Sequence, residues 1–192
     1  MDHRVVVAFT GASGAALGLA ILQRLATRPE VETHVVISPS AERTLRHEVG
    51  ENGVEWARSL ASCLHEADNI GASIASGSFR TAGMIVAPCS MHSLAAIATG
   101  LADNLVTRAA DVHLKERRKL ILLARETPLH LGHLRNMVAV TEMGAMVMPP
   151  VPAFYQRPET VADIVDHLAA RAIDLLGLPG VTETKAWAGL DV

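Results

Sequence analysis

Residues 4–14 read RVVVAFTGASG, a β-branched run that leads directly into a glycine-rich turn. The run is typical of a buried strand, and Gly11 and Gly14 permit a tight turn with close backbone approach. Residues 15–26 follow with apolar side chains at helical spacing. A strand, a tight turn and a helix in this order predict the first unit of an α/β sheet protein.

The same alternation of short apolar runs and helical periods continues along the chain. Further strands are predicted at residues 33–38, 83–87, 120–124 and 145–148. Helices are predicted at residues 41–47, 56–64, 90–99, 104–115, 130–143 and 159–176. In these patterns Ser40 caps a helix and Pro88 ends a strand. The alternation implies a parallel sheet covered on both faces, in one domain at residues 1–178 with a C-terminal arm at 179–192.

The composition limits the classes of protein that the chain can represent. Of its 192 residues 49% are hydrophobic and 19% charged, and the formal net charge of -3 argues against broad nucleic-acid binding. The apolar runs fall short of the roughly 20 residues that a membrane helix needs, so no membrane association is predicted. The N-terminus lacks a signal-peptide layout, and the two cysteines, Cys63 and Cys89, suit a reducing compartment. We therefore expect a cytoplasmic protein whose extra apolar surface covers subunit interfaces.

Ligands of parallel α/β sheets bind outside the carboxyl ends of the strands, where the turn at residues 11–14 is expected. The helix after this turn points free backbone N–H groups at an anion, and the Ser13 hydroxyl adds a donor. A plain tight turn is the alternative. The spacing differs from G-x-G-x-x-G, and Ser38 stands where a dinucleotide fold has an acidic residue. The pattern therefore favours a mononucleotide such as FMN over NAD.

A second polar turn lies at residues 87–93, which read APCSMHS. Ser90 and Ser93 open a helix there and suit a flavin ring edge or ribityl chain, although an ordinary helix cap explains them equally well. Cys89 fits a buried small residue better than a nucleophile. Cys89 and His92 supply only half of a metal site, so no metal is predicted.

Charged residues also occur in the predicted helix at 104–115 and directly after the predicted strand at 120–124. Arg108 stands in a weakly charged stretch and is a candidate phosphate clamp, whereas the basic residues at 115–119 mostly suit a solvated helix face. Arg125 and Glu126 come directly after a buried strand, so they are placed to hold an anion and to move protons. An internal ion pair between them is the alternative. A proline-rich loop before Tyr155 either presents this side chain to a neighbouring subunit or is a rigid surface loop.

Taken together, these motifs are far more specific than any one of them. In chain order they are GASGA (11–15), SGSF (76–79), APCSM (87–91), ADNLVTRAADV (102–112), LKERRKL (114–120), RETPLHLGHL (125–134), EMGAMVMPPVPAFY (142–155) and HLAARAIDLLGL (167–178). The chain resembles the UbiX family of flavin prenyltransferases over residues 5–178. The RETPLH and MPPVPAFY segments are especially distinctive.

The resemblance implies a Rossmann-like three-layer fold with a central parallel sheet, assembled as a homododecamer with shared active sites. It also implies an enzyme that binds FMN and dimethylallyl phosphate and needs no metal. The dimethylallyl group would be joined to N5 and C6 of the reduced flavin. The product, prenylated FMN, would serve a UbiD-type decarboxylase.

The resemblance also implies roles for individual residues. The FMN-binding positions are Gly11, Ala12, Ser13, Ser38, Ser90, Met91, His92, Ser93 and Arg125. The positions implied for the prenyl substrate are Arg108, Lys115, Tyr155, Arg171 and, closing over the site, Trp187. Ser13 and Glu126 are the implied catalytic residues, linked to proton movement at N5. Many relatives have lysine and threonine in place of His92 and Ser93, and the charge lost at position 92 is expected to alter flavin affinity or redox tuning.

Besides a plain phosphate-binding regulatory module, which would carry no stoichiometric flavin, two flavin-binding functions stay open at the level of sequence. An FMN-dependent cysteine decarboxylase-like oxidoreductase would share the fold, but its P-A-S-A-N-T and P-x-M-N-x-x-M-W motifs do not occur here. A flavin-binding subunit of an aromatic acid decarboxylase would bind FMN and make nothing without its partner. Consumption of a prenyl phosphate distinguishes the prenyltransferase from both.

Overall fold

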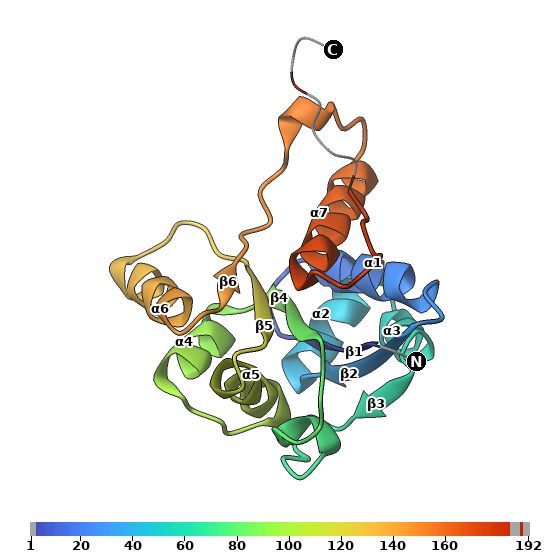
Figure 1. Ribbon diagram of the computed structural model, residues 1–192. Helices are drawn as coiled ribbons and strands as arrows, with labels where there is room; N and C mark the ends of the chain where they lie inside the picture. Colours follow the sequence, from blue (N-terminus) through green and yellow to red (C-terminus); the bar gives the residue numbers. More distant parts are fainter. Residues whose placement is uncertain (1–2, 185–188, 190–192) are drawn as a thin grey trace.

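The computed structural model describes residues 3–184 and 189 of the chain. Its centre is a parallel sheet of six strands in the order β3-β2-β1-β4-β5-β6 (Figure 1). The strands are β1 (His3–Phe9), β2 (Val31–Ile37), β3 (Cys63–His65), β4 (Gly83–Cys89), β5 (Lys119–Ala124) and β6 (Met146–Val147). The chain first builds the sheet outward from β1 to β3 and then returns to place β4 on the other side of β1. The order therefore changes direction between β1 and β4.

Helices cover both faces of the sheet and make three layers (Figure 1). One face carries α1 (Ala15–Ala26), α2 (Pro39–Val49), α3 (Gly53–Ser59) and α7 (Val161–Leu176). The other carries α4 (Met91–Thr99), α5 (Leu105–Lys115), α6 (Leu131–Glu142) and the short turn η1 (Ser73–Ala75). Successive β1 residues alternate between the cores, with Val5, Val7 and Phe9 in the first and Val6 and Ala8 in the second. The predicted three-layer fold with a central parallel sheet is confirmed.

Two predicted boundaries are wrong for identifiable reasons. α2 is capped by Ser38 rather than Ser40, because Ser38 is extended and its side chain accepts a hydrogen bond from the Ala41 N–H. β4 continues through Pro88 to Cys89 instead of ending before the proline. Its pairing with β5 is irregular at this point, so the missing proline N–H falls where the ladder is already interrupted.

The segment between α2 and β4 differs most from the prediction. In place of one helix over residues 56–64, α3 ends at Ser59 and β3 follows at the edge of the sheet. β3 has three residues, Cys63–His65, and only the central one is aliphatic. So short a strand carries no period that could reveal it before its pairing with β2 is known.

The segment between β6 and α7 rises away from the sheet (Figure 1). It contains the short turn η2 (Phe154–Gln156). Val151, Phe154 and Val161 are exposed in this segment and at the start of α7. Large apolar side chains gathered on an exposed surface are typical of a subunit contact. Among the described residues, no helix is long and apolar enough to span a membrane.

The described part of residues 179–192 packs against the body of the molecule. Glu183 forms ion pairs with Arg24 and Arg28 of the α1 region, each at 2.5 Å. Its backbone N–H also donates to Asp174 of α7 at 2.6 Å. The division into a domain and a C-terminal arm stays a prediction.

Candidate active site

The loops that leave β1 and β4 separate from one another, because the sheet changes direction between these strands. A cavity of about 310 Å³ lies there, bounded also by the beginnings of α2 and α4. Its lining residues are Thr10, Gly11, Ser38, Pro39, Ser40, Ala67, Ser90, His92, Ser93, Asn104 and Val106. The cavity thus brings together predicted flavin-binding residues from three separate turns of the sequence.

Two helices begin at the wall of this cavity. The Ser38 side chain accepts the Ala41 N–H of α2 at 3.2 Å, and the Ser90 side chain accepts the Ser93 N–H of α4 at the same distance. The Ser90 hydroxyl also donates to the Ser93 hydroxyl at 3.1 Å. Helix N-termini carry partial positive charge and unpaired N–H groups. Their convergence with several hydroxyls suits a phosphate group.

The floor of the cavity is rigid because Thr10 joins the two loops. Thr10 is 2% exposed, its hydroxyl donates to the Pro88 carbonyl at 2.7 Å, and it accepts the Ser90 N–H at 2.8 Å. Beside it, a Cβ on Gly11 would lie 2.5 Å from the Cβ of Ser40. Glycine is required here by the close approach of α2, which a side chain would displace.

The beginning of α1 differs from the prediction of free N–H groups. The Glu48 carboxylate of α2 accepts the Gly14 and Ala15 N–H groups, each at 2.9 Å. Partial burial by itself would raise the pKa of Glu48, but hydrogen bonds from the Ser13 side chain and from these N–H groups, with the charge of Arg125, lower it. Glu48 is therefore an ionised group beside Ser13, and its carboxylate occupies the N–H groups at the beginning of α1.

Arg125 and Glu126 stand at the end of β5, as the sequence predicts. Arg125 Nε donates to the Ser13 carbonyl at 3.2 Å, which links β5 to the turn after β1. Glu126 is exposed, and its Oε1 accepts the Thr127 N–H at 3.0 Å. In the part of the chain that the structure describes, no ion pair joins Arg125 to Glu126. Both residues thus follow the carboxyl end of β5 without pairing with one another.

Comparison with known proteins decides the family. The model of the Flavoprotein family matches residues 1–173 of the chain. The flavin prenyltransferase UbiX of Thauera aromatica is 53% identical over 175 residues, which cover 91% of this chain and 89% of that protein. The chain belongs to the UbiX family of flavin prenyltransferases.

Solved structures of UbiX proteins agree with this assignment. AnUbiX (PadA1), in complex with FMN and dimethylallyl pyrophosphate, has a TM-score of 0.91 and 46% identity, covering 98% of this chain and 99% of that one. A dodecameric FMN-dependent UbiX-like decarboxylase from Escherichia coli O157:H7 has a TM-score of 0.91 and 50% identity, covering 97% of this chain and all of that one. The UbiX-family chain is therefore a flavoprotein enzyme with the fold of these relatives.

The remaining flavin-binding positions predicted for this UbiX-family chain lie around the cavity without lining it. Ala12 is buried behind the turn, and Met91 packs against the second core. Cys89 is fully buried, and burial raises the pKa of its thiol to about 12. This thiol is therefore protonated, in agreement with its interpretation as a packing residue.

Arg108 and Lys115, which the UbiX resemblance assigns to the prenyl phosphate, do not line the cavity of their own chain. Arg108 Nε donates to the Ala75 carbonyl at 3.3 Å, and its Nη1 pairs with Asp111 at 2.8 Å. Lys115 pairs with Glu116 at the far end of α5, which has 11 residues and is about 16 Å long. The cavity residue Asn104 caps the opposite end of this helix. Within one chain, Lys115 is therefore a helix length away from the cavity.

Tyr155 and Arg171 are also outside the cavity. Tyr155 is exposed on η2 in the segment that rises from the sheet, and Arg171 is exposed on α7. Trp187 lies outside the described residues. The roles of these side chains in a UbiX reaction stay predictions.

Two polar residues of the site escaped sequence reasoning. Asn104 lines the cavity, and its side chain caps α5 by accepting the Thr107 N–H at 3.1 Å. Glu48 reaches the Ser13 turn from the last turn of α2, far from any motif. The sequence predicted a helix that begins at Asn104, but not that this residue lines the cavity. No local signal marks Glu48.

Proposed function

We propose that this enzyme transfers the dimethylallyl group of dimethylallyl phosphate to N5 and C6 of reduced FMN. The prenylated FMN would serve a UbiD-type decarboxylase in the cytoplasm. The observation that carries the proposal is the cavity at the change of sheet direction, in a chain of the UbiX family. Its two helix N-termini and its serine hydroxyls suit the FMN phosphate, and Ala67 and Val106 offer apolar surface beside them.

Reduced FMN would supply the nucleophilic nitrogen and carbon atoms. The bond between the allylic carbon and the phosphate oxygen would break as the bond to N5 forms, so that the phosphate leaves with the bonding electrons and the N5 proton is released. The second bond would form when the alkene gains a proton and C6 loses one, so that no oxidant or reductant is needed. Positively charged side chains would stabilise this developing charge, and Arg125, whose Nε donates to the Ser13 carbonyl, is a candidate for that role besides its predicted flavin contact. Exclusion of water by the apolar wall protects the allylic cation.

Proton movement at the flavin would depend on Ser13, Glu48 and Glu126. The ionised Glu48 holds the Ser13 side chain and thereby orients the hydroxyl. Glu126 stands at the end of β5, separated from β1 by β4, with an exposed carboxylate. A fixed hydroxyl and a carboxylate at the site edge are the usual means of moving a proton to or from a reacting nitrogen.

The same proposal includes a homo-oligomer, as in the dodecameric relative. Lys115, Tyr155 and Arg171 do not line the cavity of their own chain, so they would act on the prenyl phosphate of a neighbouring subunit. The exposed apolar side chains of the segment after β6 offer the contact surface for such an assembly.

The activity is tested by anaerobic incubation of the purified protein with reduced FMN and dimethylallyl phosphate, followed by mass spectrometry of the extracted flavin. We expect a flavin that is heavier by one dimethylallyl unit. Glu48→Gln should keep FMN but prenylate it about 100-fold or more slowly, because the anchored carboxylate is lost. Glu126→Gln should lower the rate of prenylation by a similar factor.

The matched control is Glu51→Gln, which removes an exposed carboxylate just beyond α2 and should leave the rate unchanged. Dimethylallyl diphosphate is tested in parallel to establish which donor is used. Unmodified FMN recovered from well-folded protein with both donors would contradict the proposed activity.

A further inference from the structure

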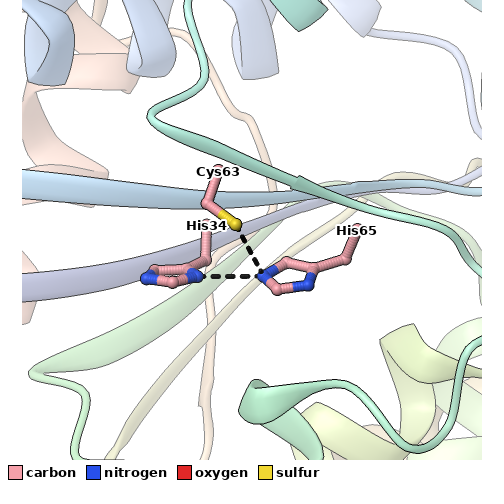
Figure 2. Close-up of side chains that lie close together, drawn as sticks. All are labelled: His34, Cys63 and His65. Carbon is pink, nitrogen blue, oxygen red and sulfur yellow. Dashed lines mark hydrogen bonds between the residues drawn. The ribbon is translucent and has the colours of Figure 1, made fainter.

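Three metal-ligating side chains gather at the edge of the sheet, outside the flavin cavity (Figure 2). His34 belongs to β2, and Cys63 and His65 belong to β3. The register pairs His34 with Cys63 and Val36 with His65. Because side chains alternate along a strand, the three ligands lie on the same face of the sheet.

The distances within this group are close to those of a metal site. His34 Nδ1 and His65 Nε2 are 2.9 Å apart, and Cys63 Sγ is 3.6 Å from the same His65 nitrogen. All three ligand atoms lie within 4.8 Å of one another. Tetrahedral zinc with ordinary bond lengths separates its nitrogen and sulfur ligands by about 3.3–3.6 Å. Side-chain rotations that move the ligand atoms by about 1 Å or less would therefore complete the triangle.

The surroundings hold His34 in the orientation of a ligand. The residue is 3% exposed, and the Phe79 ring contacts its ring edge-on, with the ring centroids 5.1 Å apart. Its second nitrogen, Nε2, is buried without a hydrogen bond and lies 3.4 Å from Glu32 Oε1, so a small rotation would let it donate to this carboxylate, which Arg4 pairs with at 3.1 Å. A carboxylate behind the outer nitrogen is the usual support of a metal-bound histidine, because it leaves the inner nitrogen free to bind.

We propose that this chain binds one Zn²⁺ ion through His34 Nδ1, Cys63 Sγ and His65 Nε2, with water in the fourth position. Imidazole and thiolate together select zinc over magnesium and calcium, which prefer oxygen ligands. On binding, the Cys63 thiol releases its proton to solvent, and the hydrogen shared by the two imidazoles moves to an outer ring nitrogen. The ion requires no change of oxidation state.

The ion would join β3 to the rest of the sheet. β3 has three residues and lies at the edge, where its pairing with β2 is short. Ala67, two residues after His65, lines the flavin cavity. A metal bond between β2 and β3 thereby anchors the segment that closes one side of this cavity, although the metal ligands themselves do not line it.

Binding is tested on the full-length protein after removal of metals with a chelator. The protein is dialysed against Zn²⁺ and its zinc content is measured by elemental analysis, with Co²⁺ substitution in parallel. We expect about one ion per chain, a thiolate-to-cobalt charge-transfer band, and the intense visible bands of tetrahedral Co²⁺. Saturating zinc should raise the thermal midpoint by roughly 5 °C.

Cys63→Ser and His65→Ala should each lower zinc affinity by roughly 100-fold or more, and Cys63→Ser should abolish the charge-transfer band. The matched control is His47→Ala, which removes an exposed histidine of α2 and should retain the ion. Thermal unfolding in chelator establishes that each variant is folded. The proposal would be overturned if the wild type bound no zinc. It would also be overturned if Cys63→Ser and His65→Ala bound as much zinc as the wild type. Neither result bears on the prenyl transfer itself.

Discussion

A buried histidine unrelated to the flavin site makes the stability of this protein sensitive to acid. His113 of α5 is 1% exposed, with Nδ1 2.7 Å from the Ala109 carbonyl and Nε2 2.8 Å from the Thr81 hydroxyl. Burial lowers its pKa to about 4, a backbone hydrogen bond opposes this, and the charge of Arg118 adds to it. Between pH 6.5 and pH 4, the unfolded chain binds a proton that the folded chain does not. Stability therefore falls with pH by about 1.4 kcal/mol per unit, or about 3 kcal/mol across this range.

The prediction is checked by urea unfolding of wild type and His113→Asn between pH 7 and pH 4.5. The variant is expected to be less stable at pH 7 but to lose less stability on acidification, because it has no imidazole to protonate. His47→Asn, at an exposed position, serves as the control and should follow the wild type. If the free energies of unfolding of wild type and His113→Asn fall in parallel as the pH is lowered, His113 is not the cause of the acid sensitivity.

At the scale of the element, the packing of α1 on the sheet depends on Gly18. A Cβ at this position would fall inside the contact distance of the Phe9 ring and of the Ala87 carbonyl oxygen. Helix propensity favours alanine over glycine by about 1 kcal/mol, but overpacking against a fixed carbonyl costs about 1–3 kcal/mol or more. The clash should dominate, so Gly18→Ala is expected to destabilise the protein by about 1–2 kcal/mol.

Thermal unfolding measures this effect. Gly71→Ala is the control, because a Cβ there meets only the Asn69 side chain at an ordinary 3.5 Å. Its midpoint should stay close to that of the wild type. If the Gly18→Ala variant were at least as stable as the wild type, α1 would be able to move away from β4 without a loss of stability.

At the scale of the whole molecule, the segment between β6 and α7 is expected to mediate assembly. Phe154 is 74% exposed in this segment, which rises away from the sheet (Figure 1). Phe154→Glu places a charge in the proposed contact and should convert a large oligomer of 20.4 kDa chains into smaller species. Light scattering after size-exclusion chromatography gives the mass directly.

Gln156→Glu on the same turn adds the same charge without removing apolar surface, and it should leave the oligomer intact. If the sites are shared between subunits, Phe154→Glu should also lose prenyl transfer while its single chains still bind FMN. Assembly unaffected by Phe154→Glu would place the main contact elsewhere on the surface.

The local sequence pattern was sufficient to predict many of the helices and strands of this protein. The helices at residues 15–26 and 104–115 and the strands around them were predicted within a few residues, because a buried face imposes its period on the sequence. The rule that ligands bind at the carboxyl ends of parallel strands brought Gly11, Ser38 and Ser90 to one site in advance. The motif order then identified the family.

Only the tertiary structure decided which distant residues meet. Glu48 meets the Ser13 turn, and His34 meets His65, because α2 packs beside α1 and β3 pairs with β2. Likewise, the direction of α5 carries Lys115 away from the cavity that begins near its capping residue. Hydrophobic period determines which face of an element is buried, but not which neighbour covers it. Contacts across elements therefore follow from strand order and register, which no single stretch of sequence contains.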